Sequence, residues 1–78
     1  MQDHNTVVVA GAGGFIGGHL VATLRSQGYK RIRAVDVKPL DEWYQRFNDV
    51  ENLRLDLNLK ENCEITAKGA EEIYNLAA

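Results

Sequence analysis

The sequence predicts an α/β fold in which four strands and two helices are arranged along the chain as β-α-β-loop-β-α-β. Apolar runs of strand length, such as Thr6–Ala10, alternate with segments whose apolar residues recur at helical spacing, such as Phe15–Gln27. The glycine-rich sequence Gly11–Gly17 lies between these two segments. Strands that alternate with helices imply a parallel sheet with right-handed crossovers, and the expected strand order is 3-2-1-4.

The first strand and the first helix are the best-defined predicted elements. Thr6–Ala10 is β-branched and continuously apolar, as expected of a strand that is buried on both faces. Phe15–Gln27 has an apolar stripe that includes Leu20 and Leu24, and Gly28 follows at a C-cap position. These boundaries place the glycine-rich sequence at a strand-to-helix turn.

The second strand is predicted over Arg31–Val35 and ends at Asp36. An irregular stretch follows it. Within that stretch, Asp41–Phe47 is expected to form a short helical turn in which Trp43 and Phe47 pack together.

The third strand, Glu51–Asp56, alternates apolar and polar residues, which suits an edge of the sheet. Asn58 and Glu61 have the spacing of a capping box, so a helix is expected to begin at Asn58 and to end before Gly69. Glu72–Leu76 is the predicted fourth strand.

Composition excludes several functional classes. The 78 residues carry 9 basic and 11 acidic side chains, so there is no basic field of the kind that nucleic-acid binding needs. No apolar run is long enough to cross a membrane, and the first five residues lack the regions of a signal peptide. His4, His19 and Cys63 do not have the spacing of metal ligands. Cys63 is the only cysteine and is expected to be a small buried hydrophobe in a cytoplasmic protein.

The glycine spacing fits the binding of a dinucleotide pyrophosphate. Gly11 allows a tight turn, Gly14 lets the backbone approach phosphate oxygens, and Gly17 lets the helix pack close to the strand. The N-terminus of the helix directs free N–H groups and a positive dipole end at the anion. The alternative interpretation is a tight strand-to-helix turn that binds nothing.

Two carboxylates follow the second and third strands. Asp36 lies 19 residues after Gly17, where it can accept hydrogen bonds from ribose hydroxyls and repel a 2′-phosphate. It therefore favours NAD over NADP, although Lys38 could accommodate a phosphate. Asp56 can reach an amine of a nucleobase, with Leu57 against the ring. The alternatives are an idle, solvated carboxylate at Asp36 and an Asp56 that only starts the next turn.

These motifs resemble those of the extended short-chain dehydrogenase/reductase family. Ala10–Gly17 is similar to the glycine motif of that family, Asp36 to its ribose-binding acid, and Asp56 with Leu57 to its adenine-contacting pair. The segment 75–78 is similar to the end of its fourth strand. The family usually has Thr or Ser in place of Ala10. The combination of Asp56–Leu57, Asn62–Cys63 and the segment 74–78 looks most like GDP-mannose 3,5-epimerases and related nucleotide-sugar epimerase/dehydratases.

The resemblance implies that residues 1–78 form a single partial Rossmann domain, the N-terminal part of a larger enzyme, with NAD as cofactor. The expected cofactor-binding residues lie in the glycine turn and at the ends of the later strands: Gly11, Gly13, Gly14, Phe15, Ile16, Gly17, Asp36, Lys38, Asp56, Leu57, Leu76, Ala77 and Ala78.

The family's catalytic Tyr-x-x-x-Lys pair does not occur in this sequence, because Tyr29, Tyr44 and Tyr74 are each followed four positions later by a residue other than Lys. We therefore expect no catalytic residue in the chain, and a nucleotide-sugar substrate only in a full-length form. The alternative function is a stand-alone, non-catalytic module that binds a dinucleotide or self-associates. A homo-oligomer is expected through the sheet edge, because Ile73, Tyr74 and Leu76 would lie on an open edge that a further strand covers in a complete fold.

Overall fold

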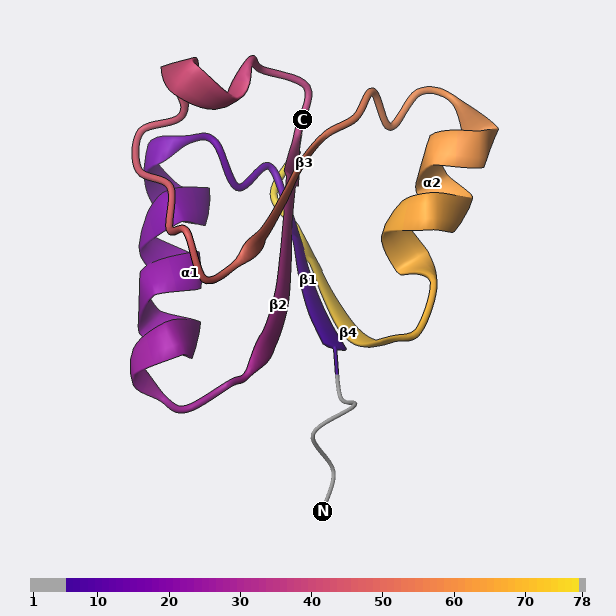
Figure 1. The fold of residues 1–78 in the computed structure, drawn as a ribbon. Coiled ribbons are helices and arrows are strands. Elements are labelled where there is room, and N and C mark those ends of the chain that lie inside the picture. The colour runs from indigo at the N-terminus through magenta and orange to yellow at the C-terminus, as the bar shows by residue number, and fades with distance from the viewer. Residues whose placement is uncertain (1–5, 78) are drawn as a thin grey trace.

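A computed structural model describes residues 6–77 and shows three layers, with the sheet between helices on its two faces (Figure 1). The elements follow the predicted order: β1 (Thr6–Ala10), α1 (Phe15–Ser26), β2 (Arg31–Asp36), the 3-10 turn η1 (Leu40–Glu42), β3 (Glu51–Arg54), α2 (Lys60–Ala67) and β4 (Ala70–Asn75).

The sheet has the order β3-β2-β1-β4, and every neighbouring pair is parallel. The predicted α/β class and strand order are therefore confirmed. Ala10 at the end of β1 pairs with Val35 on β2 and with Asn75 on β4. Because of this register, the carboxyl ends of the strands meet at one edge of the sheet.

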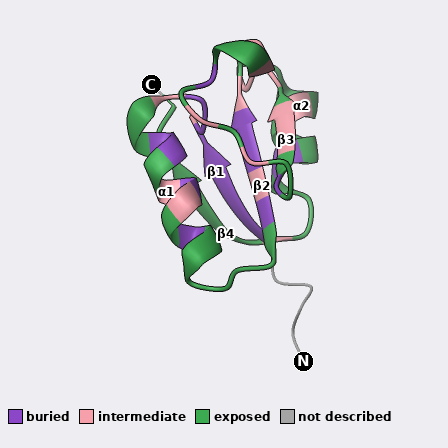
Figure 2. Ribbon diagram, turned by 60° about the vertical axis from the view of Figure 1, so that its left-hand side comes forward, coloured by how far each residue is buried: buried purple, intermediate pink, exposed green. Residues whose placement is uncertain are grey.

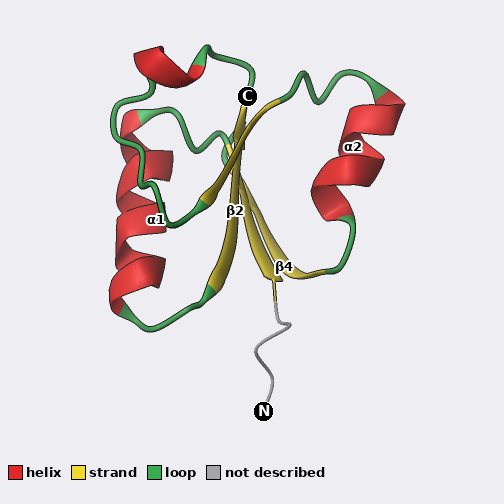
Figure 3. Cartoon of the chain, viewed as in Figure 1, coloured by secondary structure: helices red, strands yellow, loops and turns green. Residues whose placement is uncertain are grey.

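The connections divide between the two faces of the sheet (Figures 1 and 3). α1 and the loop that carries η1 cover one face, and α2 covers the other. The loop over 37–50 thus occupies the place of a crossover helix between β2 and β3, as the irregular composition of that stretch predicts. It holds only a 3-10 turn, Leu40–Glu42, instead of the helical turn expected over 41–47.

The main core lies between the sheet and α1. β1 is buried along its whole length, and β1 and β2 contain most of the buried strand residues in Figure 2. The side chains of this core come from β1, α1, β2 and the loop before β3: Val7, Val9, Ala12, Val21, Leu24, Ile32, Ala34, Trp43 and Val50. Trp43 therefore belongs to this core and Phe47 packs against it at its margin, while direct packing of the two rings stays a prediction.

α2 is much less buried than α1. Thr66 is the one buried residue of Lys60–Ala67, and Ile65 is 51% exposed. The expectation of a buried Cys63 is wrong, because Cys63 is exposed. The apolar positions that gave that expectation, Leu59 and Ala67, are exposed as well. All three positions of the predicted apolar stripe are therefore exposed.

The predicted capping box at the start of α2 is also wrong. The N-cap of α2 is Leu59, and no side chain caps the helix. Asn58 instead donates its backbone N–H to Asp56 Oδ1 at 2.9 Å, and the Leu59 N–H donates to the Asp56 carbonyl at 3.2 Å. Asp56 therefore forms a turn of its own, which delays the start of the helix.

No helix among residues 6–77 has the length and hydrophobicity that crossing a membrane requires.

Candidate functional site

The candidate site lies at the edge of the sheet where the strands end. Hydrogen bonds continue the ladder beyond the strands there: the Gly11 N–H donates to the Val35 carbonyl, and the Leu76 N–H donates to the Ala10 carbonyl, both at 2.8 Å. The segments that leave β1, β2 and β4 are therefore fixed relative to one another. This edge is where ligands bind in open parallel sheets.

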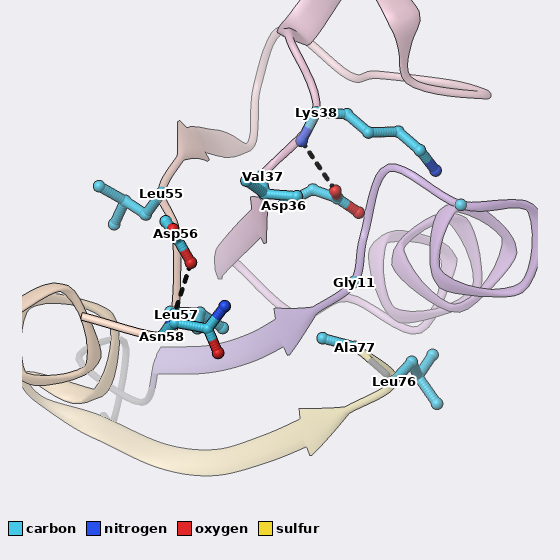
Figure 4. A pocket seen from close by; sticks show the side chains of 11 residues that line it. Gly11, Asp36, Val37, Lys38, Leu55, Asp56, Leu57, Asn58, Leu76 and Ala77 are labelled. Atoms are coloured by element: carbon cyan, nitrogen blue, oxygen red, sulfur yellow. Dashed lines mark hydrogen bonds between the residues drawn. The ribbon is translucent and has the colours of Figure 1, made fainter. Parts of the chain in front are cut away.

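A pocket of about 350 Å³ opens at this edge (Figure 4). Its volume falls at the lower end of the range for ligand pockets, about 300–1,000 Å³. Its lining comes from the glycine turn and from the ends of β2, β3 and β4: Gly11, Gly14, Asp36, Val37, Lys38, Leu55, Asp56, Leu57, Asn58, Leu76 and Ala77.

Most of the expected site residues lie in or beside this pocket. Gly13, Phe15, Ile16 and Gly17 do not line it but belong to the glycine turn and the first turn of α1, next to the lining residues Gly11 and Gly14. Ala78 lies outside the described residues.

Gly11 and Gly17 lie so close to neighbouring backbone atoms that neither position has room for a side chain. Gly11 has φ of +88°, and a Cβ there would lie 2.8 Å from Leu76 C and from Ala77 N. A Cβ on Gly17 would overlap the carbonyl oxygen of Gly11 and would lie 2.9 Å from the Ala12 Cα. The role predicted for Gly17 needs one correction, because α1 packs at this point against the turn that follows β1.

Gly14 differs, because it faces open space. It is the N-cap of α1 with φ of −83°, and a Cβ there would meet only the Gly11 carbonyl oxygen, at 3.7 Å, among the described residues. The first N–H groups of a helix have no partner within the helix. Gly14 has no side chain to accept them, and no acidic residue occupies the first turn. The space above Gly14 is therefore suited to an anion.

Asp36 ties the glycine turn to the end of β2. Its Oδ2 accepts the Gly13 N–H at 2.9 Å, and its Oδ1 accepts the Lys38 N–H at 3.0 Å. Asp36 is half-buried and therefore has a structural role in holding the turn. Because a carboxylate has about four acceptor positions, capacity for ligand hydroxyls remains on this group. The side chain of Lys38 is exposed at the rim of the pocket.

Two aromatic residues that were not predicted as site residues hold the turn from the other side. The Tyr44 N–H donates to the Gly13 carbonyl at 2.9 Å, and Trp43 Nε1 donates to the Lys38 carbonyl at 3.0 Å. A Cβ on Gly13 would lie 2.8 Å from Trp43 Cδ1. The Tyr44 ring also packs edge-on against Phe15, with the centroids 4.8 Å apart.

The segment after β3 forms the opposite wall of the pocket. Asp56 Oδ1 is bound by the Asn58 N–H, so the interpretation of Asp56 as a turn-forming residue is confirmed. Its other carboxylate oxygen has no hydrogen bond among residues 6–77 and is available to a ligand (Figure 4). The half-buried Leu57 side chain supplies apolar surface beside it.

Sequence reasoning missed three lining residues, Val37, Leu55 and Asn58. Each lies within two positions of Asp36 or Asp56. Their closeness in sequence to Asp36 or Asp56 is the signal from which these three residues could have been predicted.

Comparison with known proteins gives a family match over most of the chain. The family described as the NAD dependent epimerase/dehydratase family matches residues 7–78. Over 72 residues the chain is 35% identical to GDP-mannose 3,5-epimerase 1 of Oryza sativa subsp. japonica and 33% identical to GDP-mannose 3,5-epimerase of Arabidopsis thaliana. These matches cover 92% of the chain and 19% of each relative, so the chain spans a small part of their length.

Solved structures give the same result. MoeE5 in complex with UDP-glucuronic acid and NAD is 38% identical to the chain, with a TM-score of 0.76, and the match covers 95% of this chain and 23% of that one. A short-chain dehydrogenase/reductase superfamily protein from Agrobacterium tumefaciens with bound NAD has a TM-score of 0.78 at 24% identity, over 95% of this chain and 20% of that one. The second likeness shows the fold alone.

The sterics of the turn predict that Gly17→Ala and Gly14→Ala have different effects on stability. Gly17→Ala is expected to lower the free energy of unfolding by about 1–3 kcal/mol, because its methyl group meets backbone that cannot move aside. Gly14→Ala is expected to cost less than about 1 kcal/mol, the scale of changes at an N-cap. Urea denaturation of the two variants measures the difference. Equal destabilisation of both variants contradicts the steric account.

Proposed function

Because the chain belongs to the NAD-dependent epimerase/dehydratase family, we propose that it binds the adenosine and pyrophosphate part of NAD. The observation that carries the proposal is the open space above Gly14, at the uncapped N-terminus of α1 and beside the pocket. A pyrophosphate there accepts hydrogen bonds from the first-turn amides of Phe15 and Ile16. Their side chains, 58% and 69% exposed, lie away from the pocket.

The rest of the pocket matches the two parts of adenosine. Asp36 has acceptor positions for the ribose hydroxyls, and its negative charge disfavours the 2′-phosphate of NADP. Asp56 has an oxygen for the exocyclic amine of adenine, and Leu57 offers apolar contact to the ring. The complex of MoeE5 with NAD supports this assignment, since that protein is 38% identical to the chain.

We further propose that the chain serves as the N-terminal segment of a nucleotide-sugar epimerase or dehydratase. Its likeness to GDP-mannose 3,5-epimerases supports a nucleotide-sugar substrate for the full-length form. NAD would supply transient oxidation of the sugar by accepting and returning a hydride. The 78 residues contain no Tyr-x-x-x-Lys pair, so the part assigned to them is cofactor binding. A cytoplasmic location suits a chain with a single cysteine.

Calorimetric titration with NAD tests the proposed site. The unmodified chain is expected to bind NAD, and Gly14→Ala is expected to weaken binding at least about tenfold, equivalent to ~1.4 kcal/mol, because a methyl group enters the phosphate position. Thr23→Ala is the matched control, because Thr23 is exposed on α1 and does not line the pocket. Absence of NAD binding by the folded chain contradicts the proposal, as does unchanged binding by Gly14→Ala.

Asp36→Asn tests the preference between NAD and NADP. An asparagine removes the charge and replaces one of the two oxygens that accept the Gly13 and Lys38 N–H groups with a donor. The variant is therefore expected to bind NAD at least about tenfold more weakly, the scale of a charged hydrogen bond. It should also discriminate less against NADP. The ratio of the two dissociation constants is the measurement. If the unmodified chain binds NAD and NADP equally, the role assigned to Asp36 is wrong.

Self-association is the second candidate function, and the open edge at β4 favours it. Ile73 is 52% exposed and Leu76 is 45% exposed, and β4 pairs with β1 on its other side. An exposed, apolar edge strand is a template for pairing with another chain.

We expect the chain to form dimers or larger species across micromolar concentrations in light scattering. Ile73→Lys is expected to shift the population to monomer, because a lysine on an edge strand opposes pairing. Gln27→Lys, at the exposed C-cap of α1, adds the same single positive charge away from β4 and controls for the change in net charge. A monomeric mass for the unmodified chain rules out this candidate.

A further inference from the structure

α2 is held in place mainly by polar contacts. Only Thr66 of its eight residues is buried, so the helix gains little from apolar burial. At its C-terminal end, Arg33 of β2 donates from one nitrogen to the carbonyls of Thr66 and Lys68, at 2.7 and 2.8 Å. A guanidinium at a helix C-terminus is favoured by the helix dipole as well as by these bonds. This contact fixes α2 to the sheet.

The N-terminal end of α2 is tied to the wall of the pocket. Asn62 Nδ2 donates to the Asp56 carbonyl at 3.0 Å, and Cys63 Sγ donates to the Leu57 carbonyl at 3.0 Å. Two consecutive helix side chains thus bind the carbonyls of two consecutive pocket residues. Those residues carry the carboxylate and the apolar side chain that line the pocket.

Direct contact with a ligand is the alternative role for the side chains of Asn62 and Cys63, and the structure does not support it. Asn62 is half-buried, and its amide nitrogen is directed at the backbone of Asp56. Neither Asn62 nor Cys63 lines the pocket. Direct contact with a ligand is therefore not their role, and they act through Asp56 and Leu57.

We propose that Asn62 and Cys63 are positioning residues for adenine recognition, an inference that rests on the proposed binding of NAD. By holding the two carbonyls, they fix the peptide planes on both sides of the Leu57 Cα. The Asp56 carboxylate then stays directed at the exocyclic amine of adenine. Without these bonds, the segment between β3 and α2 loses the contacts that set this orientation.

The test compares NAD with nicotinamide hypoxanthine dinucleotide, in which the C6 amine of adenine is replaced by a carbonyl oxygen. The unmodified chain should prefer NAD, because the Asp56 carboxylate accepts from an amine and repels a carbonyl oxygen. Asn62→Ala should lower this preference about fivefold, the scale of one neutral hydrogen bond. Cys63→Ala should lower it less, because a thiol is a weak donor.

Two further variants separate positioning from general stability. Cys63→Ser keeps a donor and is expected to retain the preference that Cys63→Ala loses. Glu64→Ala changes the next, exposed position of α2 and should leave the preference unchanged. Circular dichroism confirms that each variant is folded.

The outcomes distinguish the inference from the proposed function. If Asn62→Ala and Cys63→Ala lower the affinity for both dinucleotides by the same factor, or change neither affinity, the positioning role is overturned while NAD binding stands. Equal affinity of the unmodified chain for both dinucleotides also overturns it. If the unmodified chain binds neither dinucleotide, the proposed function fails and the inference fails with it.

Discussion

The close approach of three backbone segments at the glycine turn is the constraint on which the site depends. The turn after β1, the first turn of α1 and the segment after β4 meet where a Cβ on Gly11 or Gly17 would overlap backbone atoms. This contact brings the N-terminus of α1 and the ends of the strands to one edge of the sheet. Gly14 remains uncrowded at their junction, and the space above it is the place that the fold leaves for an anion.

The two faces of the sheet are stabilised by different interactions. On the α1 face, apolar side chains form a continuous core, and Trp43 closes it beneath the glycine turn. On the α2 face, hydrogen bonds from Arg33, Asn62 and Cys63 fix a helix with little apolar burial. Segments with few buried apolar contacts open at low free-energy cost. The end of the pocket formed by Asp56 and Leu57 is therefore expected to be the less rigid part of the site.

Much of the fold could be predicted from the sequence, because strand and helix periodicity and the glycine spacing are local properties of the chain. The same patterns placed Asp36 at the end of β2, beside the glycine turn. The missed features depend on contacts between residues distant in sequence. Periodicity could not show that Trp43 packs against Gly13, or that the stripe of Leu59, Cys63 and Ala67 is left exposed. The capping box failed because Asp56 takes the Asn58 N–H that begins a separate turn.

Amide chemical shifts recorded while NAD is added test the central claim most directly, because each backbone N–H reports its own environment. We predict that the largest changes occur at Gly14–Gly17, where the pyrophosphate is assigned, and at Asp56–Asn58, where the base is assigned. Lys30 and Arg31, at the opposite end of the sheet, should not change. Saturating NAD that leaves the Gly14–Gly17 amides unshifted, or that shifts a different surface, contradicts the account.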